Sequence, residues 1–310
     1  MIGGPTAVGK TAFGVELGRR LGGEVVNADS RYLYRGFDIG VAKPDLAERG
    51  DVPHHLIDIL APTADMSLAR YQDLANGAIT QILNRGRVPL LVGGTPQYIN
   101  AVIEGWQIPR VPPNPTLRHE LERLVHDQGI QVLIDRLQRV DPVSVTRTGG
   151  NSRRVIRALE VFAATGMPMS LQQGKGPPPF NALELALTMP RDNLRAIIDD
   201  RVADQINRGL VDEVKSLLAA GVPENAPAMS SIGYRQLLPY LRGESALDAA
   251  VERIRVDTHR YLRHQETWLR KNPRLVRYDV TEPGWRERAT KHIEAFLARP
   301  AVDVSVSEDG

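Results

Sequence analysis

An eight-residue stretch near the start of the chain limits its possible folds more than any other feature. The stretch fits G-x-x-x-x-G-K-[ST] and runs Gly4, Pro5, Thr6, Ala7, Val8, Gly9, Lys10, Thr11. In such a loop the backbone amides and the next helix N-terminus surround phosphates, the lysine neutralises them and the hydroxyl binds Mg²⁺. The sequence therefore predicts a phosphate-binding loop, with Thr11 as a metal ligand, in an α/β protein with a parallel sheet.

Alternating strand and helix patterns over the first 105 residues support a parallel sheet. Buried strands are predicted within residues 23–30, 54–60 and 87–95, separated by helical segments at 11–21 and 67–86. Only three residues precede the loop, where a whole central strand is expected. Either the sheet is short at this strand or the chain begins further upstream, and both possibilities stay open.

The pattern changes near Trp106, which begins a predicted helical insertion. A proline-rich connector at 108–115 leads into helical segments, and a second breaker at 174–180 ends them. We expect a core of residues 1–105 and 184–310, and an insertion of residues 106–183. Within the core, residues 183–189 form a strand that returns to the sheet, helices follow from Leu194 to the end, and residues 301–310 form a frayed tail.

Composition narrows the class of protein. Hydrophobic residues make up 42% and charged residues 25%, as in folded proteins. Cysteine is absent, which excludes disulfides and thiolate chemistry and fits a cytoplasmic protein. No run approaches the roughly 18 apolar residues of a membrane span. The net charge is +2, but residues 253–277 carry eight basic and two acidic side chains, typical of a polyanion site or of a solvated helix face.

Asp29 is at a position suited to a catalytic carboxylate in a group-transfer reaction. It ends the predicted strand 23–30, whereas the strand at 87–95 ends in Gly93, Gly94 and Thr95 and lacks the acid that an ATPase needs there. A carboxylate on the neighbouring strand can accept a proton from an incoming nucleophile. The alternative is a turn or helix-capping residue.

Nine sequence blocks, in this order, resemble the tRNA dimethylallyltransferases, also called tRNA isopentenyltransferases: GPTAVGKT, NADS, YRGFDIGVAKP, PHHLID, LLVGGTPQYI, SRRVIRALEV, GLVDEV, SSIGYRQ and QETWLR. The resemblance covers residues 3–271. It implies a nucleoside-kinase-like core with a phosphate-binding loop and a helical insertion. It also implies Mg²⁺-dependent transfer of a dimethylallyl group from dimethylallyl diphosphate to N6 of the adenosine that follows the anticodon in tRNA.

The resemblance also assigns roles to residues. Asp29 is the general base, Thr6 and Arg201 complete the catalytic set as further diphosphate contacts, and the loop from Gly4 to Thr11 holds the diphosphate. The family's tRNA-contacting positions correspond to Asp29, Ser30, Arg31, Tyr32, Thr95, Arg118, Arg153, Arg154, Arg157, Gly233, Tyr234 and Arg235. Ser30, Arg31 and Tyr32 are expected along the base pocket. Tyr32 and Pro96 depart from the family pattern, which leaves target preference less defined than the reaction.

The segment 247–271 is predicted to be one helix with two faces. Its apolar face, which we expect in the core, carries Leu247, Ala250, Ile254, Tyr261, Leu262, Trp268 and Leu269. Its basic face, which is an RNA face or a solvated one, carries Arg253, Arg260, His264 and Lys271. A metal site at His54 and His55 is not expected, because adjacent strand residues point to opposite faces.

Three alternatives compete with tRNA prenylation. A small-molecule kinase shares the loop and the acid, but the expected lid signature is missing. An adenylate isopentenyltransferase makes the same bond on a free nucleotide but needs less basic surface. A non-catalytic RNA-binding module is the third. We expect a monomer whose partners are dimethylallyl diphosphate and a tRNA anticodon stem-loop, and whether ATP binds stays open.

Overall fold

The computed structural model describes residues 1–299, so the predicted frayed tail lies outside the described residues. The chain forms two compact units. Within the described residues, the first comprises residues 1–66, 73–99 and 181–299, and the second comprises residues 67–72 and 100–180. The helical segments expected in the insertion lie in the second unit.

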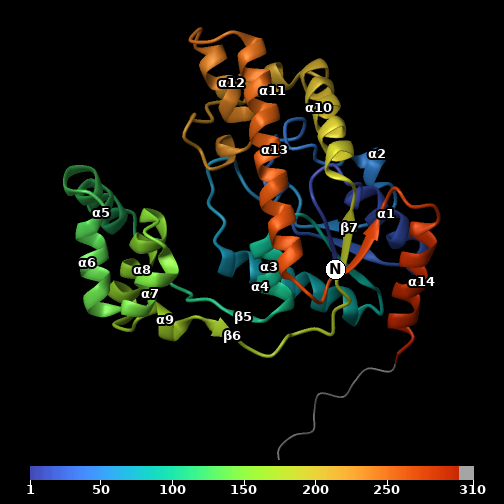
Figure 1. Cartoon of the computed structure of the whole chain (residues 1–310), viewed down its shortest axis with the longest axis horizontal. Helices are drawn as coiled ribbons and strands as arrows, with labels where there is room; N and C mark the ends of the chain where they lie inside the picture. Colours follow the sequence, from blue (N-terminus) through green and yellow to red (C-terminus); the bar gives the residue numbers. More distant parts are fainter. Residues whose placement is uncertain (300–310) are drawn as a thin grey trace, which may run out of the picture. The chain divides into compact units, whose positions relative to one another are not determined.

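A six-stranded parallel sheet forms the centre of the first unit (Figure 1). Its spatial order is β3-β2-β4-β1-β7-β8. The strands are β1 (Ile2–Gly3), β2 (Glu24–Asn27), β3 (His54–His55), β4 (Pro89–Val92), β7 (Leu185–Thr188) and β8 (Val276–Asp279). The predicted α/β class with a parallel sheet is confirmed.

The central strand β1 is two residues long. Ile2 pairs with Val92 of β4 and with Leu185 of β7, and its side chain is buried. The strand predicted at 183–189 is confirmed as β7, beside β1. The phosphate-binding loop therefore leaves the middle of the sheet, where neighbouring strands flank it on both sides.

Two predictions about secondary structure are wrong. The strand expected over 54–60 stops at His55, because Leu56 and Asp58 have φ angles of 62° and 57°, which a strand does not allow. The run of helices expected from Leu194 to the end is interrupted by β8, which pairs with β7 along its full length.

Helices pack around this sheet (Figure 1). α13 has the predicted bounds, Leu247–Lys271, and buries the apolar side chains of Ala250, Ile254, Leu262 and Leu269. α3 and α4 each contain residues of both units. The helices outside the second unit's bundle are α1 (Lys10–Leu21), α2 (Leu46–Arg49), α3 (Leu68–Asn84), α4 (Pro96–Ile103), α10 (Arg191–Asn207), α11 (Leu210–Ala219), α12 (Tyr234–Leu241), α13 and α14 (Trp285–Leu297), with a 3₁₀ helix at Ala228–Ser230.

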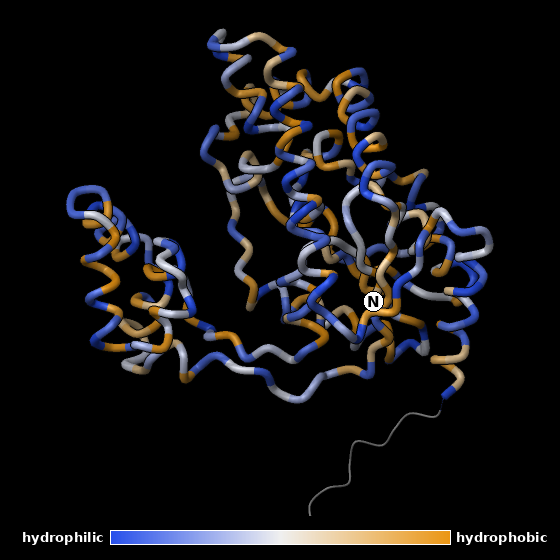
Figure 2. The backbone as a smooth tube through the Cα atoms, viewed as in Figure 1, coloured by the Kyte–Doolittle hydropathy of each residue, from blue (hydrophilic) through white to orange (hydrophobic). Residues whose placement is uncertain are grey.

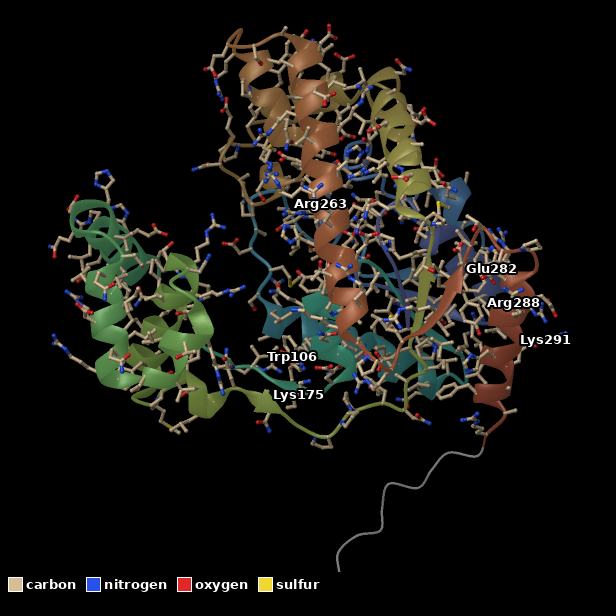
Figure 3. The ribbon with its side chains drawn as sticks, viewed as in Figure 1. Trp106, Lys175, Arg263, Glu282, Arg288 and Lys291 are labelled. Carbon is tan, nitrogen blue, oxygen red and sulfur yellow. The ribbon has the colours of Figure 1, made fainter. Side chains whose placement is uncertain are left out.

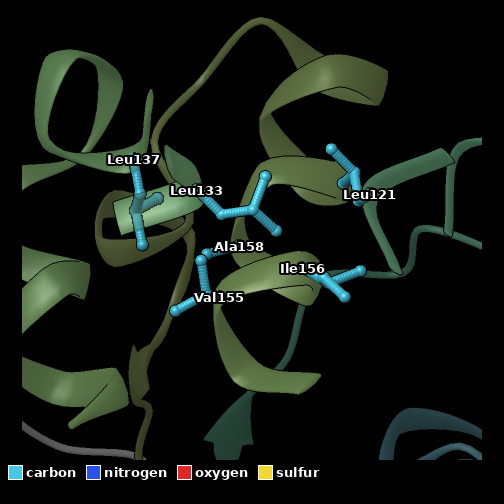
Figure 4. Close-up of a cluster of buried hydrophobic side chains, with 6 residues drawn as sticks. All are labelled: Leu121, Leu133, Leu137, Val155, Ile156 and Ala158. Carbon is cyan, nitrogen blue, oxygen red and sulfur yellow. The ribbon is translucent and has the colours of Figure 1, made fainter. Parts of the chain in front are cut away.

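The second unit is a small helical bundle with its own core. Its helices are α5 (Pro115–Gln128), α6 (Gln131–Val140), α7 (Pro142–Thr148), α8 (Ser152–Thr165) and α9 (Met169–Gln172). Hydrophobic and hydrophilic residues alternate along them, as amphipathic helices require (Figure 2). The core residues, shown in Figure 4, are Leu121, Leu133, Leu137, Val155, Ile156 and Ala158.

A two-stranded antiparallel ribbon lies at the ends of the second unit's segment. Strand β5 (Trp106–Gln107) pairs with β6 (Gly174–Lys175), and Figure 3 labels one residue of each. Glu104 accepts hydrogen bonds from the Trp106 indole and the Lys175 ammonium, at 2.8 and 2.7 Å. The ribbon thus pairs the segment that enters the bundle with the segment that leaves it.

Among residues 1–299, no helix is long and apolar enough to span a bilayer.

Candidate active site

The phosphate-binding loop connects β1 to α1 through two glycines that the geometry requires. Gly9 has a φ of 91°, in the left-handed region, and directly precedes the first residue of α1. A Cβ on Gly4 would lie 2.7 Å from the carbonyl oxygen of Leu187 and 2.9 Å from Val8 Cγ1. The loop can therefore pass close to β7 and present its amides at the N-terminus of α1.

Lys10 reaches back across the loop. Its ammonium donates to the carbonyl oxygen of Pro5 at 2.7 Å. Burial lowers the pKa of Lys10 to about 8; the Asp29 carboxylate opposes this shift and the Arg201 guanidinium adds to it. An anion bound in the loop would favour the protonated ammonium, so Lys10 is suited to bind a phosphate group.

Asp29 follows β2 and is held in a fixed turn. The Asn27 side chain accepts the Asp29 N–H at 2.8 Å and donates to the Asp29 carbonyl at 2.9 Å. Asp29 Oδ1 accepts the N–H of Arg31 at 2.9 Å. The turn fixes the backbone on both sides of the carboxylate, as a group that must meet a reacting atom requires.

Two cavities meet at this carboxylate. The smaller, about 440 Å³, is lined by the loop residues Thr6, Lys10 and Thr11, and the larger, about 590 Å³, extends toward α12 and α13. Both volumes suit small-molecule groups. The residues that line both cavities are Thr6, Asp29, Val41, Ala42, Arg201, Gln205 and Tyr261. The three predicted catalytic residues, Asp29, Arg201 and Thr6, are thus all found at the junction.

Arg201 brings an uncompensated positive charge to the junction. It lies on α10 and, within the described part of the chain, no carboxylate pairs with its guanidinium and no hydrogen bond reaches it. Its positive charge helps to lower the pKa of Lys10. A cation without an anionic partner beside a phosphate-binding loop is a second site for negative charge.

Five predicted tRNA-contacting residues line the larger cavity: Asp29, Ser30, Arg31, Thr95 and Arg235. Ser30 donates its N–H to Thr95 Oγ1 at 3.1 Å, and Thr95 donates its own N–H to the carbonyl of Ala28 at 3.1 Å. Arg31 crosses to the 3₁₀ helix and donates to Ser230 Oγ at 3.1 Å. These contacts bring Ser30, Arg31 and Thr95 to one wall of the larger cavity.

Tyr32 does not line the larger cavity with Ser30 and Arg31. It lines the smaller cavity, beside Thr11, and donates its hydroxyl to the carbonyl of Ala42 at 2.9 Å. Burial, first, and the nearby Asp29 carboxylate raise its pKa. The phenol is therefore a neutral hydrogen-bonding group on the phosphate side.

Of the predicted block 233–235, only Arg235 is exposed. Tyr234 is completely buried; its hydroxyl donates to Glu213 and accepts the N–H of Gly40 at 3.2 Å. Gly233, with a φ of 99°, is also buried and begins α12. The prediction that Gly233 and Tyr234 contact tRNA is corrected to a core position, because their surroundings are protein.

The predicted arginines of the second unit divide into two pairs. Arg118 donates to the buried Glu160 through two nitrogens at 2.8 and 2.9 Å, and Arg157 binds Glu160 and the carbonyl of Val111. Both arginines pair with Glu160 while staying partly exposed, and their contact with tRNA stays a prediction. Arg153 and Arg154 are exposed on α8, and over residues 1–299 neither forms an ion pair.

Two buried polar residues of α13 were missed. Asp257 accepts from Gln236 Nε2 at 2.8 Å and pairs with Arg235, Arg253 and Arg260 at 3.2–3.4 Å. Gln265 binds two loops of the site. Both residues lie on the buried side of the helix, so a polar residue among apolar ones on the helical wheel was the available signal.

Close contacts leave no room for a side chain at Gly93 and Gly94, which follow β4. A Cβ on Gly93 would lie 2.2 Å from the carbonyl carbon of Ala28, and one on Gly94 would lie 2.5 Å from Gln265 Nε2. In place of an acidic metal ligand, β4 thus ends in a backbone that packs against Asp29's strand and α13. Among the residues that the structure describes, no three acidic or histidine side chains cluster to hold a metal.

A parallel sheet with a phosphate-binding loop at its central strand, and a carboxylate where two cavities meet, define a phosphate-binding-loop α/β protein suited to group transfer. A family model described as IPP transferase matches residues 32–272. The chain therefore belongs to the IPP transferase family.

Similar proteins of known sequence or structure agree with this family. The chain is 53% identical to the tRNA dimethylallyltransferase of Thermomicrobium roseum, covering 99% of this chain and 94% of the relative. A crystal structure of the tRNA isopentenylpyrophosphate transferase from Bacillus halodurans is 40% identical, with a TM-score of 0.70 over 96% of this chain and 94% of that one. A eukaryotic dimethylallyltransferase acting on tRNA has a TM-score of 0.79 at 25% identity, over 96% of this chain and 79% of the other.

Proposed function

We propose that this chain transfers a dimethylallyl group from dimethylallyl diphosphate to N6 of the adenosine that follows the anticodon in tRNA. The observation that carries the proposal is the junction of the two cavities, lined by Thr6, Asp29 and Arg201. The smaller cavity holds the diphosphate against the loop, and the larger one holds the adenine. The names of the relatives support tRNA over a free nucleotide as acceptor, and over a kinase reaction.

The reaction needs a proton acceptor and a stabilised leaving group. N6 of adenine attacks C1 of the dimethylallyl group, the C1–O bond breaks, and its electron pair leaves with the diphosphate. Lys10 and Arg201 stabilise the negative charge that develops on the diphosphate. Asp29 accepts the N6 proton, which becomes acidic only as the new bond forms.

The donor set fits the Mg²⁺ expected for this chemistry. Mg²⁺ keeps several waters and uses one or two protein ligands together with phosphate oxygens, so the absence of an acidic cluster among residues 1–299 does not argue against it. Thr11, at the first turn of α1 and lining the smaller cavity, would supply the protein oxygen. When bound, the ion neutralises charge on the diphosphate.

Recognition of tRNA uses basic residues of both units. The adenine must leave its stack to enter the larger cavity, because a stacked base could not reach the loop. Arg235 and the exposed basic face of α13 border that cavity, and Arg153 and Arg154 supply exposed charge on α8. A cytoplasmic location and a monomeric state complete the proposal.

The proposal is tested with two acceptors in parallel. The purified chain is incubated with Mg²⁺ and dimethylallyl diphosphate, with unmodified tRNA in one reaction and AMP in the other, and the nucleosides are weighed by mass spectrometry. Prenylated adenosine from tRNA alone is expected. Prenylated AMP would favour the free-nucleotide enzyme, and no product from either acceptor would contradict the proposal.

A further inference from the structure

Gln265 is a buried polar residue in α13 to which none of the roles above applies. Its side chain is 3% exposed, in a helix that otherwise buries mainly apolar groups. A buried amide needs hydrogen-bond partners, because leaving it unsatisfied lowers the stability of the folded chain. The partners of Gln265 come from two different loops at one edge of the sheet.

The amide of Gln265 joins these loops through both of its polar atoms. Oε1 accepts the backbone N–H of Thr6 at 2.8 Å, and Nε2 donates to the carbonyl of Gly94 at 2.8 Å. Tyr261, one helical turn earlier, donates its hydroxyl to the same carbonyl at 3.3 Å. The approach is so close that a Cβ on Gly94 would lie 2.5 Å from Nε2. Specific hydrogen bonds therefore hold α13 against both loops.

Each loop carries groups from a different side of the proposed reaction. Thr6 belongs to the phosphate-binding loop and lines both cavities. Gly94 precedes Thr95, which accepts the N–H of Ser30 at 3.1 Å in the turn that presents Asp29. One side chain thus spans the gap between the diphosphate side and the proton-acceptor side. A displacement of about 1 Å in such a site can cost about 100-fold in rate.

We propose that Gln265 is a positioning residue that sets the separation between the phosphate-binding loop and the turn of Asp29. This inference rests on the proposed transfer reaction. Gln265 acts through Thr6 and Gly94: it holds the loop amide on one side and the β4 turn on the other. Gln265 lines the smaller cavity, but its two polar atoms are engaged by Thr6 and Gly94, so its loss misaligns the two reacting atoms and removes no binding group of either substrate.

Two variants test this role. Gln265→Glu keeps the size and the acceptor for Thr6 but turns an oxygen toward the carbonyl of Gly94. Gln265→Met fills a similar volume with neither hydrogen bond, and it decides the question if the first variant does not fold. We expect kcat at saturating concentrations of both substrates to fall at least about tenfold, while the Kd values of dimethylallyl diphosphate and tRNA change less than about threefold.

Gln72→Glu is the matched control. Gln72 is also 3% exposed and donates to two carbonyls, those of Ala101 and Trp106, at 2.6 and 2.8 Å, within the second unit. It should lower Tm without changing kcat per folded molecule. The inference is overturned if the Gln265 variants lower Tm as this control does but keep the parent kcat. If the parent chain itself makes no prenylated tRNA, the proposed function fails instead, so the two failures are distinguishable.

Discussion

The protonation of Lys10 should limit activity at alkaline pH. Burial lowers the pKa of its ammonium to about 8. Below that pH the side chain is charged and attracts the diphosphate; above it the amine becomes neutral and the attraction is lost. The value of kcat/KM reports ionisations of the free enzyme and free substrate. The kcat/KM for dimethylallyl diphosphate should therefore be level from pH 7 to about 7.5 and decline above pH 8.

The size of this decline follows from the titration of one group. At its pKa half of the lysine is protonated, and 1.5 pH units above it only about 3% is, so kcat/KM should fall about 16-fold between pH 8 and pH 9.5. The neighbouring Tyr32 and Tyr261 do not produce this effect, because burial raises the pKa of both phenols further above this range. Initial rates at subsaturating dimethylallyl diphosphate, with saturating tRNA and fixed Mg²⁺, measure it.

Lys10→Arg provides the control, because a guanidinium stays charged throughout this range. The variant is expected to have a lower maximum, since the guanidinium cannot reproduce the contact of the ammonium with Pro5. Its profile should nevertheless stay level to pH 9.5. A parent profile that is level to pH 9.5, or the same decline in Lys10→Arg, would show that Lys10 does not cause the loss of activity.

Other predictions separate structural from RNA-binding residues. Arg118→Ala removes two hydrogen bonds from the buried Glu160 and should lower the free energy of unfolding of the chain by about 1–3 kcal/mol, measured in urea. Arg154→Ala should change stability by less than about 0.5 kcal/mol, but weaken tRNA binding and reduce the salt slope by about one. Tyr234→Phe should cost about 1–3 kcal/mol of stability and leave tRNA affinity unchanged. A loss of affinity in folded Tyr234→Phe, or an unchanged salt slope in Arg154→Ala, would contradict these assignments.

Local patterns predicted much of the fold. The loop from Gly4 to Thr11 and the alternating strands and helices are encoded in short segments, and the amphipathic period of 247–271 gives the bounds of α13. β8 was missed because four residues after a turn carry little periodic signal. The strand at 54–60 was overextended because hydropathy does not report the positive φ angles of Leu56 and Asp58.

The candidate site was harder to predict where partners lie far apart in the sequence. The two hydrogen bonds from Arg118 to Glu160, 42 positions away, were not predicted because the sequence gives no sign that Glu160 is buried. Gln265 was missed because the helical wheel ranks residues by hydropathy, whereas this amide is stabilised by loops more than 170 positions away. Such pairings depend on tertiary structure.

The role of Asp29 in the transfer reaction is tested most directly by the single-turnover transfer rate of Asp29→Asn, measured beside its tRNA affinity. The variant keeps the size of the side chain and an oxygen for the N–H of Arg31, but cannot accept the N6 proton. If Asp29 is the proton acceptor, the rate should be about 10²–10⁴-fold below that of the parent chain, with tRNA affinity unchanged. A variant that transfers the dimethylallyl group at the parent rate would contradict the assignment of Asp29 as the proton acceptor.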